Sequence, residues 1–203
     1  MYRVIFGGSF DPIHLGHLAI ADAVHREIAP DQLLWVPAQI APHKQHLPPA
    51  PAADRLALVQ AATLNRPQER ILDWELQRPA PSYTVHTLRQ LKQHDPDGKL
   101  DLVLGLDSLS HLASWHRLDE IMQLAGFLFL PRVDCEASDL DNFRGQLSPD
   151  FKALFRAQVV QMHRVPVSST QIRERLAKGD RCQQLLPAAV ALEIENRGLY
   201  RSD

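Results

Sequence analysis

Residues 7–17 read Gly7-Gly8-Ser9-Phe10-Asp11-Pro12-Ile13-His14-Leu15-Gly16-His17, and they join a short apolar run to a helical pattern. The run at residues 4–6 predicts a buried strand, and the pattern after the stretch predicts a helix to about residue 28. Gly7 and Gly8 carry no side chains, so another group can approach the backbone closely. His14 and His17 are three residues apart, which places both imidazoles on one face near the helix N-terminus. That end favours negative charge, so the stretch predicts a phosphate site.

Two common nucleotide-binding patterns are not found in this stretch. It matches neither the G-x-G-x-x-G dinucleotide fingerprint nor the phosphate loop with its Gly-Lys-Ser/Thr ending. A glycine turn before a helix is common where nothing binds, and an exposed histidine is usually only solvated. Two histidines flanking Gly16, directly behind the two glycines, are what favour a nucleotide-phosphate site.

Composition limits the class of protein. The chain has 203 residues, 45% of them apolar, and a net charge of −2. This length allows one substantial core, so a single domain over residues 1–203 is expected. Proteins that bind many nucleic-acid phosphates normally carry a strong basic excess, which is missing here. Cys135 and Cys182 form no CxxC unit, which fits a protein of the reducing cytoplasm. No apolar run approaches membrane-spanning length, so no membrane partner is expected.

Short apolar runs alternate with helical patterns along the chain. Strands are predicted at residues 4–6, 33–36, 71–72, 100–104 and 127–130, and further helices at residues 52–64, 83–93 and 118–124. This rhythm predicts an α/β fold with a Rossmann-like, doubly wound parallel sheet and C-terminal helices. Ligands of such sheets lie beyond the carboxyl ends of the strands, so Gly7-Gly8, Pro37, Gly105 and Pro131 should converge. Residues 38–51 are expected to form a surface loop, and the acidic residues 134–150 a mobile or variable connection.

The second informative stretch is Val167-Ser168-Ser169-Thr170-Gln171-Ile172-Arg173. Ser168 and Gln171 form a capping box at the start of a helix, with Ile172 on its buried face and Gly179 at its end. An ordinary well-capped helix explains this serine and glutamine without any function. It does not explain three consecutive hydroxyl side chains with Arg173 one turn later, which predict a second helix N-terminus ready for phosphate.

These two stretches resemble the signatures of a known family. His14-Leu15-Gly16-His17 resembles the HxGH signature of the nucleotidyltransferases, and residues 7–14 closely match the bacterial nicotinate-nucleotide adenylyltransferases, with Ser9 where that family usually has threonine. Residues 168–173 resemble its second signature, a Ser-Ser/Ala-Thr-x-Ile-Arg run. The resemblance extends to the closing Gly198-Leu199-Tyr200-Arg201. It implies transfer of the adenylyl group of ATP to nicotinate mononucleotide, giving deamido-NAD and pyrophosphate, in NAD biosynthesis.

The resemblance implies that His14 and His17 are catalytic, as hydrogen-bond donors to phosphate oxygens. The expected ATP site joins both signatures to a few positions between them: Gly7, Gly8, Ser9, Phe10, His14, His17, Lys44, Gly105, Asp107, Arg132, Ser168, Ser169, Thr170 and Arg173. Lys44 stands in Ala41-Pro42-His43-Lys44, where the family commonly has Pro-Pro-His and a basic residue, although a lysine in such a loop is usually only solvated. Asp107, in a Gly-x-Asp-Ser-Leu run that resembles a nucleotide contact, can also simply cap the next helix.

Two further segments resemble the family's nicotinate pocket, Pro81-Ser82-Tyr83-Thr84 and Ser114-Trp115-His116. The mononucleotide is expected to contact Tyr83, Thr84, Trp115 and His116, and backbone N–H groups near Thr84 and His116 are implied to read its carboxylate. A tryptophan is more often a core residue. Trp115, however, stands between polar residues just before a helix, and its face can stack on a pyridine ring. His86 stands where relatives often carry Asp or Gln, which leaves the polar edge of this pocket open.

No protein metal site is assigned, because no Cys/His cluster has zinc spacing. The expected cofactor is Mg²⁺ carried with the ATP phosphates. The expected partners are ATP and nicotinate mononucleotide, with no nucleic acid, and the sequence leaves the oligomeric state open, a homo-oligomer included. The alternatives are another HxGH enzyme, such as a pantetheine-phosphate adenylyltransferase or a cytidylyltransferase, and a nucleotide-binding protein without catalysis. A class I aminoacyl-tRNA synthetase is disfavoured because the chain is short and lacks a KMSKS-like loop.

Overall fold

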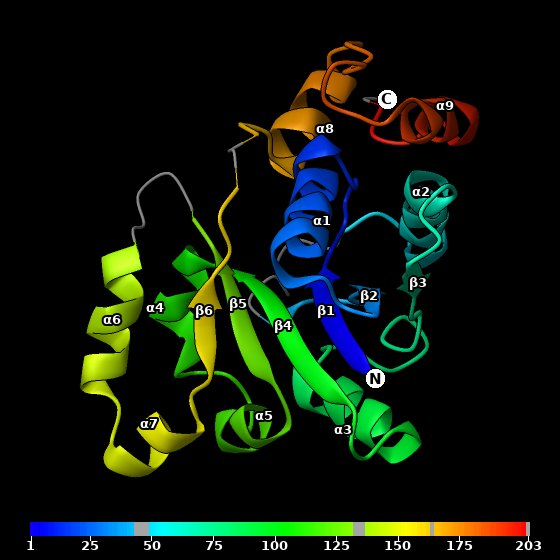
Figure 1. Ribbon diagram of the computed structural model, residues 1–203. Helices are drawn as coiled ribbons and strands as arrows, with labels where there is room; N and C mark the ends of the chain where they lie inside the picture. The colour runs from blue at the N-terminus through cyan, green and yellow to red at the C-terminus, as the bar shows by residue number, and fades with distance from the viewer. Residues whose placement is uncertain (43–48, 132–136, 163–164, 202–203) are drawn as a thin grey trace. The chain divides into compact units, whose positions relative to one another are not determined.

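The computed structural model describes residues 1–42, 49–131, 137–162 and 165–201 (Figure 1). The strands are β1 (Tyr2–Gly8), β2 (Gln32–Pro37), β3 (Glu69–Ile71), β4 (Lys99–Gly105), β5 (Gly126–Leu130) and β6 (Ala157–Val159). The helices are α1 (Leu15–Ile28), α2 (Ala52–Thr63), α3 (Thr84–His94), α4 (Leu109–Leu112), α5 (Leu118–Leu124), α6 (Ala137–Gln146), α7 (Pro149–Leu154), α8 (Ser169–Ala177) and α9 (Ala188–Arg197), with the 3-10 turn η2 (Leu106–Ser108) before α4.

The six strands form one parallel sheet in the order β3-β2-β1-β4-β5-β6. Tyr2 of β1 lies opposite Lys99 of β4, and Gly105 of β4 lies opposite Leu130 of β5. Every residue of β5 is buried. Such continuous burial is typical of parallel strands covered on both faces, which is why they read as unbroken apolar runs. The prediction of an α/β, Rossmann-like parallel sheet is confirmed.

The chain forms two compact units, each assembled from three segments. Unit 1 comprises Met1–Phe6, Asp22–Leu33 and Tyr83–Arg164, and unit 2 comprises Gly7–Ala21, Leu34–Ser82 and Val165–Asp203. The strand β1 and the helix α1 therefore each begin in one unit and end in the other. The expectation of a single domain stays a prediction.

The core of unit 1 contains a cluster of phenylalanines. The ring centroids of Phe127 and Phe129 on β5 are 5.9 Å apart, and Phe155 lies 5.3 Å from Phe127. Phe143 of α6 reaches Phe155 at 5.4 Å, and Leu140 is buried. Figure 1 shows α6 and α7 beside β6. The prediction that residues 134–150 form a mobile or variable connection is therefore wrong from residue 137 onward, because two apolar residues one turn apart anchor α6 among polar neighbours.

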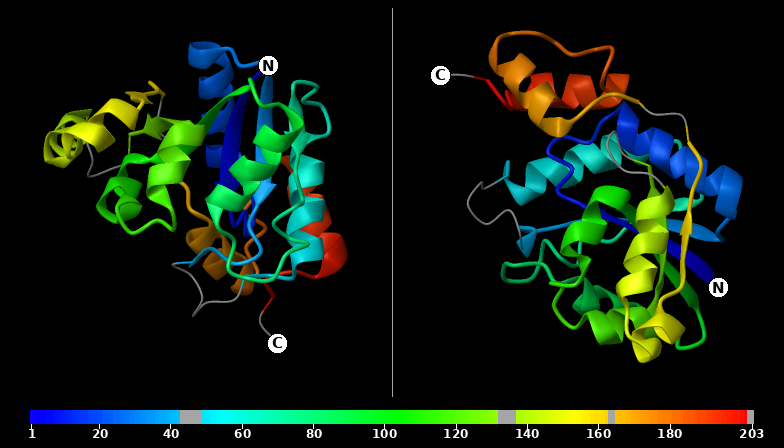
Figure 2. Two further views of the ribbon diagram at one scale, coloured as in Figure 1. Left: turned by 90° about the horizontal axis from the view of Figure 1, so that it is seen from below. Right: turned by 90° about the vertical axis from the view of Figure 1, so that its left-hand side faces the viewer.

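In unit 2, the C-terminal helix α9 packs along α2 (Figure 2). Arg197 of α9 donates a hydrogen bond of 2.9 Å to Asp54 of α2. The indole of Trp35 on β2 is fully buried, and its Nε1 donates to Glu69 on β3 at 2.7 Å. The buried polar atom of that indole is thus paired, as interiors require. The predicted C-terminal helices are present, and α9 joins the core of unit 2 through α2.

Some element boundaries differ from the prediction. The strand β1 continues through Gly7 and Gly8 instead of turning there, and the backbone N–H of Ala38 donates to the carbonyl of Gly8 at 2.9 Å. The carboxyl ends of β1 and β2 thus lie side by side in unit 2, and those of β4 and β5 do so in unit 1. The three-residue strand β6 was not predicted, because so short an edge strand leaves little pattern.

The described residues include no helix that has both the length and the apolar character to cross a membrane.

Candidate active site

Two stacked imidazoles lie at the N-terminal end of α1, in unit 2. The ring centroids of His14 and His17 are 3.7 Å apart, with an angle of 24° between the ring planes. The backbone N–H of His14 donates to Nδ1 of His17 at 3.2 Å. Neutral His17 therefore carries its proton on Nε2, and this tautomer makes Nε2–H a hydrogen-bond donor. The predicted neighbourhood of the two rings is confirmed.

Glycines make the room that this pair requires. A Cβ on Gly16 would lie 3.0 Å from the ring of His14 and 2.8 Å from Cγ1 of Val167. A Cβ on Gly8 would lie 3.1 Å from the ring of Phe10. The Phe10 side chain is only 2% exposed, and its ring centroid is 5.1 Å from that of His17 in an edge-to-face contact. The Phe10 ring therefore packs against His17 and is itself covered.

Helix α8 begins beside this histidine turn. Ser168 caps the helix as predicted, because its Oγ accepts a backbone N–H at 3.2 Å. Ser169 Oγ donates to the carbonyl of Pro12 at 3.0 Å, and Nη1 of Arg173 donates to the carbonyl of Asp11 at 2.7 Å. These bonds join residues 157 and 162 positions apart in the sequence. The two stretches that were each predicted to bind phosphate therefore lie together in unit 2.

The carboxylate of Asp11 is a buried hydrogen-bond acceptor in this region, with the residue 8% exposed. Its Oδ1 accepts from the hydroxyl of Tyr200 at 2.8 Å and from the backbone N–H of Ala50 at 3.2 Å. Its Oδ2 lies 3.5 Å from Nη1 of Arg173. Burial raises the pKa of the Tyr200 phenol, and the charge of Asp11 raises it further. Tyr200 therefore stays protonated and acts as a donor.

Arg55, in α2, is 1% exposed. Its guanidinium donates at 2.7 to 3.1 Å to the four backbone carbonyls of Ser9, Ala38, Gln39 and Ala50. Burial lowers the pKa of Arg55, whereas the carboxylate of Asp11 raises it and so favours the charged form. A guanidinium presents five donors in a fixed fork. Arg55 therefore ties the segment after β1 to the segments after β2 and before α2.

Sequence analysis assigned no role to Asp11, Arg55 or Tyr200. Asp11 stands inside the first signature and Tyr200 among the closing residues, so both lie in stretches that the sequence singled out. Nothing in the sequence marks Arg55 as buried, because an arginine in a helix is normally a surface residue. Its burial depends on its backbone partners, which lie 5 to 46 positions away in the sequence.

The expected nicotinate-binding residues lie in unit 1. Tyr83 immediately precedes α3, and its ring centroid is 4.5 Å from that of His116, on the connection between α4 and α5. His86 places its ring 6.3 Å from His116. Trp115 is half-buried on the same connection, and Thr84 is the first residue of α3. The structure therefore brings the two segments predicted for this pocket together.

An ion pair holds α3 against α5 close to these rings. Arg89 of α3 donates to both carboxylate oxygens of Glu120 on α5, at 2.5 and 2.6 Å. Arg117 lies 3.1 Å from the same carboxylate. The hydrogen bonds from Arg89 hold the pKa of Glu120 below its ordinary value, and the neighbouring positive charges lower it further. The carboxylate is therefore ionised at neutral pH, and its ion pair with Arg89 is present at that pH.

Three remaining candidates have different outcomes. Asp107 lies inside the turn η2 and is exposed, whereas the N-cap residues of η2 and α4 are Gly105 and Ser108. Asp107 is therefore not the N-cap residue of η2 or α4. Lys44 and Arg132 lie outside the described residues.

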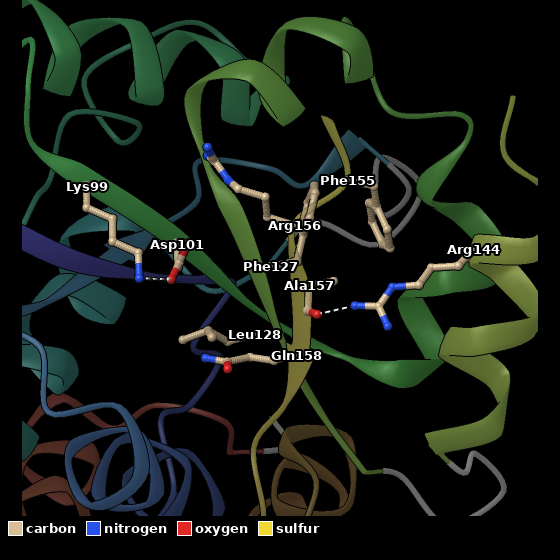
Figure 3. Close-up of a pocket in the computed structure, with 9 residues that line it drawn as sticks. All are labelled: Lys99, Asp101, Phe127, Leu128, Arg144, Phe155, Arg156, Ala157 and Gln158. Carbon is tan, nitrogen blue, oxygen red and sulfur yellow. Dashed lines mark hydrogen bonds and ion pairs between the residues drawn. The ribbon is translucent and has the colours of Figure 1, made fainter. Parts of the chain in front are cut away.

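A hollow of about 380 Å³ in unit 1 contains none of the predicted site residues (Figure 3). It lies where β4, β5 and β6 begin, whereas ligands of such sheets bind where strands end. Lys99 pairs with Asp101 at 3.7 Å on one side, and Arg144 bonds the carbonyl of Ala157 on the other. Because these positive side chains pair separately and do not converge, the hollow is not the candidate active site.

The chain is similar to known proteins over nearly its whole length. A cytidylyltransferase-like family model matches residues 5–175. Probable nicotinate-nucleotide adenylyltransferases from Dehalococcoides mccartyi and Geobacillus thermodenitrificans are each 36% identical to this chain over 97% of its length, and 95% and 84% of their own lengths are covered. The Plasmodium falciparum nicotinic acid mononucleotide adenylyltransferase complexed with NaAD has a TM-score of 0.78 at 18% identity, covering 98% of this chain and 97% of its own. At that identity the structural likeness shows the fold alone.

Proposed function

This chain belongs to the nicotinate-nucleotide adenylyltransferases of the cytidylyltransferase-like family, and from that premise we propose that it transfers the adenylyl group of ATP to nicotinate mononucleotide. The products are deamido-NAD and pyrophosphate, and the reaction belongs to NAD biosynthesis. The observation that carries the proposal is the meeting of the two signatures, where Ser169 and Arg173 bond the backbone of the histidine turn. Two helix N-termini and two histidines are thereby collected at one place, which suits a polyphosphate.

The reaction needs no nucleophilic side chain. The 5′-phosphate oxygen of the mononucleotide forms a bond to the α-phosphorus of ATP, while the P–O bond to the β-phosphate breaks and its electron pair leaves on pyrophosphate. Enzymes catalyse such displacements by positioning and by stabilising charge. His17 has its Nδ1 occupied by the N–H of His14, so its Nε2–H is the donor for the developing charge.

Residues around this pair would bind the rest of ATP. Arg173, Ser169 and Thr170 belong to the N-terminal turns of α8, and Ser168 caps that helix. Gly7, Gly8 and Ser9 supply backbone where the chain carries little side-chain bulk, while Gly105 ends β4 and Asp107 follows it in η2. Lys44 and Arg132 would add positive charge to the phosphates. The acceptor would use the rings of Tyr83 and Trp115 and the backbone near Thr84 and His116.

Magnesium is proposed as the cofactor, held mainly by ATP. No cluster of three or more His, Cys, Asp or Glu side chains suited to a metal occurs in the part of the chain that the structure describes. Mg²⁺ keeps most of its water ligands and can bind through substrate phosphates with few protein ligands. When bound, the ion neutralises charge on the phosphate oxygens. The residues of the α1 and α8 N-termini orient the same phosphates.

A turnover assay tests the proposal. The purified protein is incubated with Mg²⁺, ATP and one acceptor at a time, and pyrophosphate and the dinucleotide product are measured. Nicotinate mononucleotide should be the best acceptor, ahead of nicotinamide mononucleotide and 4′-phosphopantetheine, and CTP should not replace ATP. Pyrophosphate release with another acceptor only would move the chain to a different reaction of its family. Nucleotide binding without release from any pair would favour a binding protein.

A further inference from the structure

The C-terminal end of the chain reaches the first signature through a single hydroxyl group. After α9 the chain turns at Gly198, whose φ is +63°, and again at Tyr200, whose φ is +60°. The left-handed region is natural for Gly198 but unfavourable for a tyrosine. Tyr200 is held there while its hydroxyl donates to Asp11 at 2.8 Å and its side chain is half-buried. A strained residue with a buried polar contact indicates a specific role for that contact.

Asp11 connects Tyr200 to Arg173. One carboxylate oxygen of Asp11 accepts from Tyr200 and from the N–H of Ala50, so its orientation is fixed by two donors. The other oxygen is thereby turned toward Arg173, at 3.5 Å, while Arg173 also donates to the Asp11 carbonyl at 2.7 Å. The guanidinium is held mainly by the carbonyl, and the carboxylate lies at the long end of ion-pair distance. Arg173 is therefore fixed in place without being fully neutralised.

We propose that Tyr200 is a positioning residue that acts through Asp11 to hold Arg173 for the polyphosphate of ATP. This inference rests on the proposed function, in which Arg173 contacts ATP. Without the Tyr200 hydroxyl, Oδ1 of Asp11 loses one of its two donors, and the carboxylate is freer to turn both oxygens toward Arg173. A closer pairing would compete with the substrate phosphates for the same guanidinium.

Tyr200→Phe is the direct test, because it removes one oxygen and keeps the ring. The chain offers a matched control in Tyr2→Phe, since the Tyr2 hydroxyl also donates to a buried aspartate, Asp101, at 2.5 Å, but within unit 1. Loss of a hydrogen bond to a charged group predicts a rise of about tenfold in the KM for ATP in Tyr200→Phe, with changes of no more than about twofold in kcat and in the KM for the mononucleotide. Tyr2→Phe should leave all three constants within about twofold of the wild type.

A direct binding measurement separates this proposal from the proposed function. The affinity for Mg²⁺-ATP alone, measured by calorimetry, should fall about tenfold in Tyr200→Phe and not in Tyr2→Phe, whichever acceptor the enzyme uses. Failure of the wild type to release pyrophosphate with nicotinate mononucleotide would count against the proposed function and not against this measurement. Equal ATP affinity in the wild type and Tyr200→Phe would overturn the positioning role.

A second variant covers the case in which Tyr200→Phe does not fold. Asp11→Asn keeps the oxygen that faces Tyr200 but turns an N–H₂ group toward Arg173, so it should weaken ATP affinity by a similar factor. Where Tyr200→Phe does fold, adding it to Asp11→Asn should change ATP affinity by less than about twofold, because residues of one network are not additive. Normal ATP affinity in a folded Asp11→Asn, or independent effects of the two substitutions, would contradict an action through Asp11.

Discussion

Replacing His17 by alanine tests the proposed catalytic donor. The ring centroid of His17 lies 3.7 Å from that of His14 and 5.1 Å from that of Phe10. Its Nδ1 accepts a hydrogen bond from a backbone N–H, so Nε2 is held in a fixed position. Removing one preorganised donor to a developing charge costs about 3 kcal/mol, or roughly 100-fold to 1,000-fold in kcat. His17 is half-buried at the start of α1 and not in the core, so the fold should survive. We expect kcat/KM in His17→Ala to fall at least about 100-fold with only a small loss of stability.

The measurement is steady-state pyrophosphate release, with circular dichroism and thermal unfolding on the same samples. His17→Gln is the matched variant, because its amide N–H₂ can reach the region of Nε2, and it should recover part of the lost rate. Folded His17→Ala with turnover within about threefold of the wild type would remove His17 from the catalytic residues and refute the reasoning from its tautomer.

Other substitutions and substrates test the remaining parts of the site. Arg173→Ala should weaken use of ATP more than use of the mononucleotide, and Arg173→Lys should restore it only in part; equal losses for both substrates would favour a plain capped helix. Nicotinate mononucleotide should be preferred to its amide by at least about 100-fold in kcat/KM, because an amide N–H₂ facing a backbone N–H leaves buried donors unpaired; comparable rates in side-by-side assays would exclude a pocket that reads a carboxylate. Trp115→Ala should impair both mononucleotides, since stacking contacts the ring and not its substituent; normal kinetics with either would remove it from the pocket. Arg55→Met should cost about 3 to 5 kcal/mol in the free energy of unfolding, because four carbonyls lose their donor and Asp11 loses a nearby positive charge, whereas exposed Arg70→Met should cost little; urea denaturation measures both, and equal small losses would show that the buried bonds do not stabilise the fold.

The sequence predicted the sheet because its longer strands contain continuous buried apolar runs. The strand β5 is buried and apolar throughout, and residues 102–104 of β4 are apolar without interruption, so the positions of these strands and the α/β class followed from the pattern. Residues 137–150 were mispredicted for the opposite reason. The helix α6 is mostly polar, with Leu140 buried and Phe143 in contact with Phe155, and α7 has no buried residue. Ser148 followed by Pro149, a normal helix start, was the local signal that could have identified α7.

In the candidate site, too, some contacts could be predicted from the sequence and others could not. The histidine pair and the Ser168 cap depend on neighbours within three residues, so local spacing predicted their geometry. The bonds of Asp11 to Tyr200 and of Arg55 to Ser9 join residues 189 and 46 positions apart. No local pattern encodes such pairs, and the residue types alone indicate only that each polar group needs a partner once it is buried.

The geometry of Arg173 explains why an arginine suits this position better than a lysine. In the described contacts, Nη1 serves Asp11 and Nη2 reaches Thr170 Oγ1 at 3.4 Å. A guanidinium has five N–H donors, so Nε–H and a second N–H on Nη2 carry no bond in those contacts. Phosphate can therefore be bound without releasing the carbonyl that positions the side chain. A lysine has three donors on one rotating nitrogen, so it would have to release the carbonyl of Asp11 in order to bind phosphate. Donors already in place cost little reorganisation when charge develops, which is how this site can stabilise a transition state without a covalent intermediate.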